Sequence, residues 1–267
     1  MSMTSTPRAV GDHLREWRQR RRLSQMDLAL DAEISTRHLS FLETGRAQPS
    51  REMVLHLADQ LEIPLRDRNI ILVAAGFAPV FPERRLDDPA LAAARRAIDL
   101  ILTGHEPFPA LAIDRRWNLV AANRAATALM AGVDPSLVAG PINVLRLSLH
   151  PKGLGGRILN LQEWRAHIFE RLRHQIELTA DPGLAALLEE LRAYPANSAQ
   201  PRRPVEDYGG VAIPLQLQMG EGVLSFFTTT TVFGTPVDVT LSELALETFF
   251  PADAATAEAI RHLAPPG

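Results

Sequence analysis

The sequence predicts an all-α domain at the N-terminal end, followed by an α+β domain that contains a five-stranded antiparallel sheet with helices. Residues 23–49 read as two short capped helices joined by a tight turn, whereas residues 210–249 are mainly strand-like. Between them, residues 77–88 hold two prolines and a run of charges, which is typical of a linker. We therefore expect a disordered tail at residues 1–9, the helical domain at 10–76, the linker at 77–88 and the second domain at 89–264.

Capping residues and apolar spacing predict five helices in the first domain. Ser24 and Asp27 form the S-x-x-D pattern that starts a helix, and Ser35 and Ser50 stand before two more helices. Pro64 occupies a position where a first-turn proline is favourable. The expected helices cover residues 12–22, 25–32, 36–43, 51–61 and 65–75.

The third of these helices has an outward face of hydrogen-bonding side chains. Leu39 and Leu42 face inward, which leaves four polar residues outside: Thr36, Arg37, His38 and Ser40. The major groove of DNA presents acceptors and amino donors that such side chains can read. The alternative interpretation is an ordinary solvated helix face.

Residues 10–75 resemble the lambda-type repressor domain, the Cro/C1 or XRE helix-turn-helix family. The resemblance rests on LSQ at 23–25, LA at 28–29 and LSFLETG at 39–45. It implies a lambda-repressor-like fold, in which Arg18 pairs structurally with Glu43 and Gln25 holds a DNA phosphate. It also implies that the start of the third helix contacts bases, so the expected DNA-binding residues are Gln25, Ser35, Thr36, Arg37, His38, Ser40 and Arg46.

The turn between the second and third helices departs from that family. Many members carry Gly where this chain has Ala32 and Glu33. A Glu at a position that needs positive φ would be strained, because its Cβ crowds the backbone there. We therefore expect the turn to differ locally from that of the family.

The absence of cysteine fits a protein of a reducing compartment. The 267 residues include no Cys, so disulfides, thiolate metal sites and Cys nucleophiles are excluded. No secretory signal is expected, and the apolar run at 70–81 is too short to cross a bilayer. We expect a cytoplasmic protein.

A net charge of −3 does not exclude DNA binding, because DNA binding depends on local patches of positive charge. The candidate patch consists of Arg15, Arg18, Arg20, Arg21 and Arg22.

In the second domain, two short strands precede a series of helices and three further strands follow. The strands are expected at 110–114, 118–122, 210–219, 223–233 and 237–249. The helices are expected at 89–102 with Asp88 as its cap, at 124–130, 143–149, 161–178 and 184–194, and after Asp253. This order gives a five-stranded antiparallel sheet with helices on one side. The arrangement is typical of PAS-like small-molecule sensors.

Residues 87–263 resemble the ligand-binding domain of MmyB-like transcription regulators. The matching stretches are PALAIDRRWNLVAANRAA at 109–126, NVLRL and HP within 143–151, the helix with Trp164 and Arg173, and DPGLAAL at 181–187. The chain departs from the family after Leu191, where no Trp follows Tyr194, and along residues 210–233. The resemblance implies a PAS-like pocket for a small apolar molecule, with a long-chain fatty acid as the first candidate.

Two sets of residues are candidates for this ligand pocket. Apolar side chains could line it or form ordinary core: Leu145, Leu149, Trp164, Ile168, Phe226, Phe227 and Phe249. A buried carboxylate needs a partner, and Arg is favoured because it binds carboxylate in a bidentate manner. The candidate partners are Arg146, Arg173, His150, His167 and His174, although the arginines could instead be surface groups or members of internal salt bridges.

Other chemistries find little support. His167 and His174 share a helix face, but no third ligand stands at metal spacing, so no metal site is expected. Gly153, Gly155 and Gly156 lack the Lys-Ser/Thr of a phosphate loop, and no G-x-S-x-G is present. Neither a cofactor nor an enzymatic activity is expected.

The sequence therefore predicts a ligand-responsive regulator that binds double-stranded DNA as a homodimer. One alternative is a DNA-binding protein whose second domain is a protein-interaction module with a filled core. A weaker alternative is a lipid-handling enzyme fused to a repressor domain.

Overall fold

The structure is a computed structural model that describes residues 8–195 and 213–263. Most of the predicted tail at 1–9 and the start of the strand predicted at 210–219 lie outside these residues. The chain divides into two compact units. The first comprises residues 1–84 and 235–242, and the second comprises 85–234 and 243–267.

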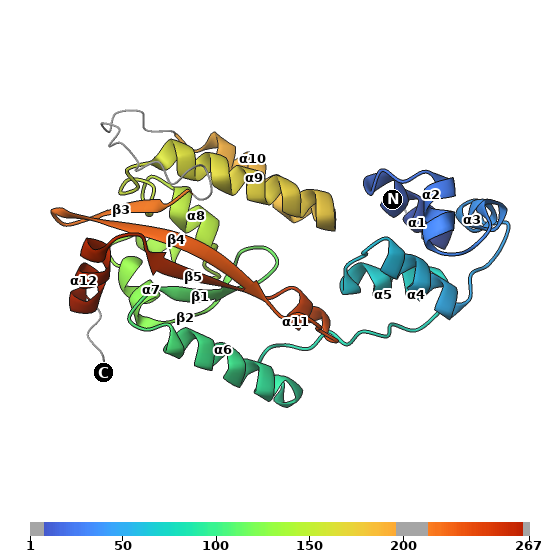
Figure 1. Ribbon diagram of the computed structural model, residues 1–267, viewed down its shortest axis with the longest axis horizontal. Helices are drawn as coiled ribbons and strands as arrows, with labels where there is room; N and C mark the ends of the chain where they lie inside the picture. Colours follow the sequence, from blue (N-terminus) through green and yellow to red (C-terminus); the bar gives the residue numbers. More distant parts are fainter. Residues whose placement is uncertain (1–7, 196–212, 264–267) are drawn as a thin grey trace, which may run out of the picture. The chain divides into compact units, whose positions relative to one another are not determined.

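Five helices form the body of the first unit, within two residues of the predicted bounds (Figure 1). They are α1 (Val10–Arg20), α2 (Gln25–Asp31), α3 (Thr36–Glu43), α4 (Arg51–Gln60) and α5 (Leu65–Ala74). Ser24 and Asp27 form the predicted capping box, and the hydroxyls of Ser35 and Ser50 accept a backbone N–H three residues on. These side chains satisfy helix-terminal donors that would otherwise lack partners.

The leucines of these helices make the core, with Leu14, Leu28, Leu39 and Leu42 fully buried. Gly11 lets α1 approach the end of α3, because a Cβ there would stand 2.5 Å from the carbonyl oxygen of Leu42. The core therefore holds α3 firmly by its inner face.

The turn after α2 keeps a residue with positive φ, although that residue is not glycine. Glu33 has a φ of 52° and an exposed side chain. Its N–H donates to the carbonyl of Leu30, which closes the turn before Ser35 starts α3. A non-glycine residue in this region costs free energy that the surrounding helices must offset.

A short segment from far along the sequence completes the first unit. It contains α11 (Val239–Ser242), and the N–H of Val239 donates to the carbonyl of Pro82 at 2.8 Å. Arg84 donates to the buried carboxylate of Asp238 at 3.0 Å. The prediction of one continuous strand at 237–249 is therefore wrong in its first half. The Asp238 carboxylate accepts the N–H of Thr240 and starts a helical turn instead.

The second unit contains the predicted five-stranded antiparallel sheet, in the order β2-β1-β5-β4-β3. The strands are β1 (Ala110–Ile113), β2 (Leu119–Ala122), β3 (Leu215–Met219), β4 (Gly222–Val232) and β5 (Ala245–Pro251). In this register Glu247 of β5 lies opposite both Leu111 of β1 and Thr230 of β4.

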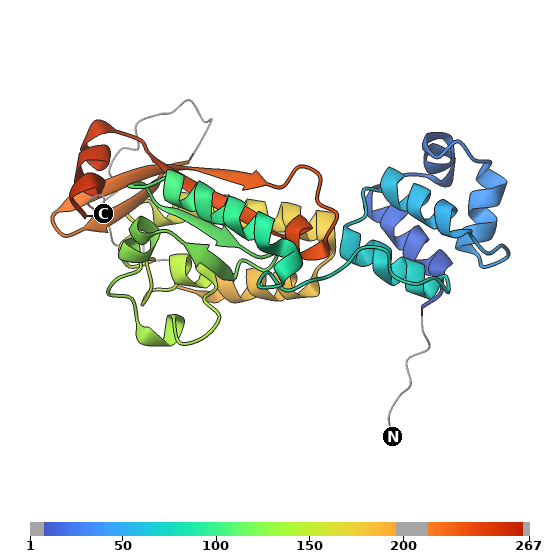
Figure 2. The ribbon, with the colours of Figure 1, turned by 90° about the horizontal axis from the view of Figure 1, so that it is seen from below.

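Helices cover both faces of the sheet, whereas the sequence predicts them on one side. The short helices η1 (Pro89–Leu91), α7 (Arg124–Leu129), η2 (Pro135–Leu137) and α8 (Val144–Leu149) are followed by the longer α9 (Leu161–Thr179) and α10 (Pro182–Ala193), and α12 (Ala254–Leu263) ends the described chain. In Figure 1, α8, α9 and α10 lie above the sheet, and α6 (Ala92–Gly104) lies below it. Figure 2 shows α6 from its outer side, in front of the strands.

The correction follows from β1, whose four residues are all buried. Ala110 and Ala112 pack with Ile98 of α6, while Leu111 and Ile113 belong to the larger core on the other face. A strand that is apolar at every position is buried on both sides, which simple alternation does not predict.

Candidate functional site

The exposed face of α3 presents the residues predicted to bind DNA. Ser35, Thr36 and Arg37 are exposed, and His38 and Ser40 are partly exposed. The Ser35 hydroxyl accepts the N–H of His38 at 3.1 Å, so its side chain also caps the helix. The N-terminal half of α3 thus faces solvent while Leu39 and Leu42 anchor it from behind.

Phe41 brings two guanidinium groups to this face. The guanidinium carbon of Arg37 lies 5.2 Å from the centre of the Phe41 ring, and that of Arg46 lies 5.9 Å away. Both distances are within the range of cation–π attraction. Arg46 is therefore placed with the predicted reading helix although it follows the end of that helix.

Behind this face, a buried ion pair joins three helices. Arg18 of α1 donates from Nε and Nη2 to the two carboxylate oxygens of Glu43, at 2.6 and 2.9 Å. The pKa of Arg18 is raised, chiefly by this hydrogen bonding. Gln25 of α2 donates to the same carboxylate at 2.7 Å. The predicted Arg18–Glu43 pair thus forms, and Gln25 is held by it at the start of α2.

The arginine cluster of the first helix is less available than the sequence predicts. Arg18 is buried, Arg20 pairs with Glu16 at 2.8 Å, and Arg21 donates to the carbonyls of Leu61 and Glu62. Arg15 and Arg22 are exposed. Much of this charge stabilises the helical unit itself.

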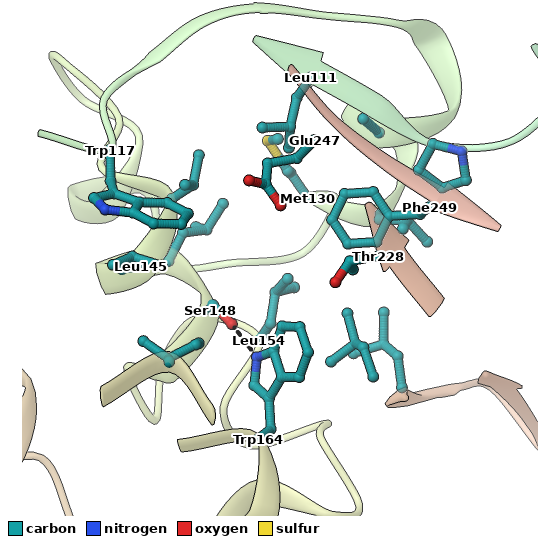
Figure 3. A pocket seen from close by; sticks show the side chains of 18 of the residues that line it. Leu111, Trp117, Met130, Leu145, Ser148, Leu154, Trp164, Thr228, Glu247 and Phe249 are labelled. Atoms are coloured by element: carbon teal, nitrogen blue, oxygen red, sulfur yellow. Dashed lines mark hydrogen bonds between the residues drawn. The ribbon is translucent and has the colours of Figure 1, made fainter. Parts of the chain in front are cut away.

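The second unit contains a partly open apolar cavity of about 90 Å³ between the sheet and helices α7, α8 and α9. Figure 3 shows side chains of the sheet opposite those of the helices around this space. The main apolar walls are Leu111, Trp117, Met130, Leu145, Trp164 and Phe249. A cavity of about 10–15 Å³ is enough to hold one water molecule. The core of the second unit is therefore not completely filled by side chains.

One charged pair stands in this apolar wall. Arg171 of α9 donates to the two carboxylate oxygens of Glu247, at 2.8 and 3.3 Å. Thr230 accepts a hydrogen bond from Arg171 at 2.9 Å and donates to Glu247 at 2.9 Å. The Glu247 side chain is only 5% exposed, so the burial of its charge depends on Arg171.

Trp117 supports Arg171 from a strained backbone position. Its φ is 66°, a value that is uncommon for a bulky residue, and the guanidinium of Arg171 lies 4.7 Å from the ring centre. The indole N–H donates to Gln175 at 2.8 Å, and Gln175 in turn donates to the carbonyl of Arg115. The tight turn around Asp114 thereby presents an aromatic ring to the cavity.

Two further polar side chains line the cavity. The Ser148 hydroxyl accepts the indole N–H of Trp164 at 2.9 Å, as the dashed line in Figure 3 shows. Thr228 of β4 extends its hydroxyl toward the space. The wall of the cavity is thus mainly apolar, and its polar members are Arg171, Glu247, Ser148 and Thr228. Such a combination is expected for a site that orients an amphipathic molecule.

Each of the two units matches a known protein family. Residues 94–263, more than half of the chain, match the model of the MmyB-like transcription regulator ligand binding domain. The chain belongs to the MmyB-like transcription regulators. Residues 9–69 match a helix-turn-helix domain. Both resemblances inferred from the sequence are therefore confirmed. No curated protein matches the chain.

The MmyB-like domain brings four of the predicted apolar ligand residues to the cavity: Leu145, Trp164, Ile168 and Phe249. Leu149 and Phe226 are fully buried in the core and do not line it. Phe227 is only partly buried, and it points to the opposite side of β4 from the lining residue Thr228 because neighbouring strand residues alternate in direction.

The predicted carboxylate partners lie elsewhere in the MmyB-like domain. Arg146 donates to both carboxylate oxygens of Glu190, at 2.7 and 2.8 Å, which is the salt-bridge alternative. The His150 ring packs edge-on against Tyr194, and Arg173 is exposed on α9. None of these three lines the cavity.

The cation that does line the cavity is Arg171, which the sequence reasoning missed. The signal was present, because Arg171 follows Trp164 by seven residues and Ile168 by three, on the same helix face. Its partner Glu247 had no comparable signal. Within the described residues, no helix has the combination of length and apolarity that membrane crossing requires.

Proposed function

We propose that this MmyB-like regulator reads DNA with α3 and changes its DNA affinity when a small, largely apolar effector enters the cavity beside Trp117 and Trp164. A long-chain fatty acid is the first candidate effector. The protein acts as a homodimer in the cytoplasm, and it is not an enzyme.

The observation that carries this proposal is the unfilled apolar cavity. Space for several water molecules, walled by leucines and aromatic rings, is unfavourable for water and favourable for an alkyl chain. The polar group around Arg171 supports an amphipathic effector over a pure hydrocarbon. A protein-interaction module needs neither feature, so that alternative is less well supported.

The DNA-binding part of the proposal rests on the exposed N-terminal half of α3. A recognition helix places such residues against base edges. Gln25 at the start of α2 is only partly buried, and we assign it the phosphate contact that the family resemblance implies. Two copies reading half-sites about one helical turn apart give the specificity that one short helix lacks. This geometry predicts a pseudo-palindromic operator.

The test is to purify the protein natively, extract it with organic solvent and identify the extract by mass spectrometry. We expect a stoichiometric apolar molecule. Leu145→Trp, which adds volume at the cavity wall, should lose that molecule. Leu100→Trp is the matched control, because Leu100 is exposed on α6 and outside the cavity. A clean extract from the parent protein, and failure to bind added fatty acids, would favour the docking module.

A further inference from the structure

The charged pair in the cavity restricts the chemistry of the effector's polar end. Glu247 is buried among apolar side chains, and a carboxylate in such a place is costly unless it is paired. Figure 3 shows that the carboxylate projects between Trp117 and Phe249 into the cavity. An entering ligand therefore meets this group directly.

The hydrogen bonds of Glu247 leave room for one more donor. Oε1 accepts from Arg171 and from Thr230, at 2.8 and 2.9 Å. Among the residues that the structure describes, Oε2 accepts only the longer bond from Arg171, at 3.3 Å. Since a carboxylate offers about four acceptor positions, Oε2 can take a hydrogen bond from a ligand hydroxyl or N–H. A carboxylate anion has no such hydrogen to give.

The charge balance favours the same kind of ligand. Arg171 is already neutralised by Glu247, so an anionic ligand would place a second carboxylate beside the same guanidinium. Two carboxylates that share one buried site repel each other, which strongly raises the pKa of one of them and favours a complex in which that carboxylate retains a proton. The cavity can accept a fatty acid only if the complex carries that proton.

We propose, on the basis of the effector binding proposed above, that Glu247, Arg171 and Thr230 select effectors whose polar end is uncharged and donates a hydrogen bond. A hydroxyl, an amide N–H and a protonated carboxylic acid share this chemistry. Glu247 is thus the residue that determines head-group specificity, and Arg171 holds it in place.

The groups around Glu247 make the expected pH dependence simple to interpret. On α9 the charged or titratable neighbours are Arg171 and His167. The facing residues of β1 and β4 are Leu111 and Thr230, which do not titrate. Burial and then the charge of Arg171 lower the pKa of His167, so most of this imidazole is already neutral at pH 6.5 and the protonated fraction falls further above that pH. A proton taken up with a fatty acid above that pH is therefore assigned to the carboxylate pair.

The first test is titration of the full-length protein by calorimetry with two probes of equal chain length, 1-dodecanol and dodecanoate. The affinity for 1-dodecanol should not change between pH 6.5 and pH 8.5. The affinity for dodecanoate should fall about tenfold per pH unit over this range, because each binding event takes up one proton. Dodecanoate that binds at pH 8.5 as tightly as 1-dodecanol, without a pH slope, would overturn the inference.

The second test is Glu247→Gln, with Glu190→Gln as its matched control. Glu190 is also paired with an arginine in a bidentate manner but does not line the cavity. Glu247→Gln should remove the pH slope and tighten dodecanoate binding at pH 8.5 by tenfold or more, because Arg171 is then free to pair with the ligand. The control should behave as the parent protein.

These measurements separate the inference from the function on which it rests. Binding of both probes with a preference for the anion refutes the head-group selectivity alone. Binding of neither probe in the parent protein refutes the proposed effector site together with the selectivity.

Discussion

The buried pair behind the recognition helix allows a quantitative test of how the helical unit is held together. Arg18→Met removes the guanidinium but keeps most of the side-chain volume. The Glu43 side chain is 1% exposed, and of its hydrogen bonds to described residues it would retain only that from Gln25. Loss of one member of a buried ion pair costs about 3–5 kcal/mol. That is a large part of the roughly 5–15 kcal/mol that stabilises an ordinary domain.

The design includes a second variant that removes both charges, Arg18→Met with Glu43→Leu. Replacement of both members by apolar groups is often neutral, because the desolvation penalty disappears together with the attraction. We expect the double variant to be more stable than Arg18→Met alone, although Gln25 then also loses its acceptor.

The assay is amide hydrogen exchange of peptides from α1, α2 and α3, which reports the unfolding free energy of this unit within the full chain. For Arg18→Met, we expect the unfolding free energy measured in each of the three helices to fall by the same amount, about 3 kcal/mol or more. A loss below about 1 kcal/mol, or a double variant less stable than the single one, would refute the reasoning that the pair is an interdependent buried unit.

Three further predictions concern single side chains. Arg37→Ala should weaken operator binding by about 1–3 kcal/mol in fluorescence anisotropy, whereas Arg173→Ala, on the exposed face of α9, should leave it unchanged. Ser24→Ala removes the capping box of α2 and should lower the stability of the helical unit by about 0.5–2 kcal/mol in the same exchange assay; an unchanged value would show that Asp27 alone suffices. Hydrogen bonding from Arg146 lowers the pKa of Glu190, so this pair should stabilise the fold above the unfolded pKa of about 4.3 and lose its effect as pH falls through the lower folded pKa. Because both side chains are partly exposed, Glu190→Gln should cost less than about 1 kcal/mol at pH 7 in thermal unfolding, and the difference from the parent should vanish in acid.

Local signals in the sequence were sufficient for most of the helices. Ser24, Ser35 and Ser50 mark helix starts because their hydroxyls satisfy the first backbone N–H groups, a short-range effect that needs no knowledge of the fold. The spacing of Leu39 and Leu42 likewise determines which face of α3 is exposed. The pair of Arg18 and Glu43 came from family resemblance and not from spacing.

Long-range pairing accounts for most of what was missed. Thr230 and Glu247 meet only because β4 and β5 pair in one particular register, and no local pattern specifies that register. The β-branched residues around Asp238 favour a strand, but the Asp238 carboxylate binds the backbone locally and a helical turn forms. In both cases a specific contact outweighs an average tendency.

The discontinuity of the DNA-binding unit has a consequence for any attempt to separate the two halves of this protein. A fragment that stops at Arg84 lacks residues 235–242, and with them the buried Asp238 carboxylate that Arg84 binds and the N–H that Pro82 receives. A cut after Arg84 therefore does not release the complete first unit. To transfer this unit to another sensor domain, both of its segments, residues 1–84 and 235–242, must be included in the fusion. A fusion that carries the first segment alone would leave Arg84 without Asp238.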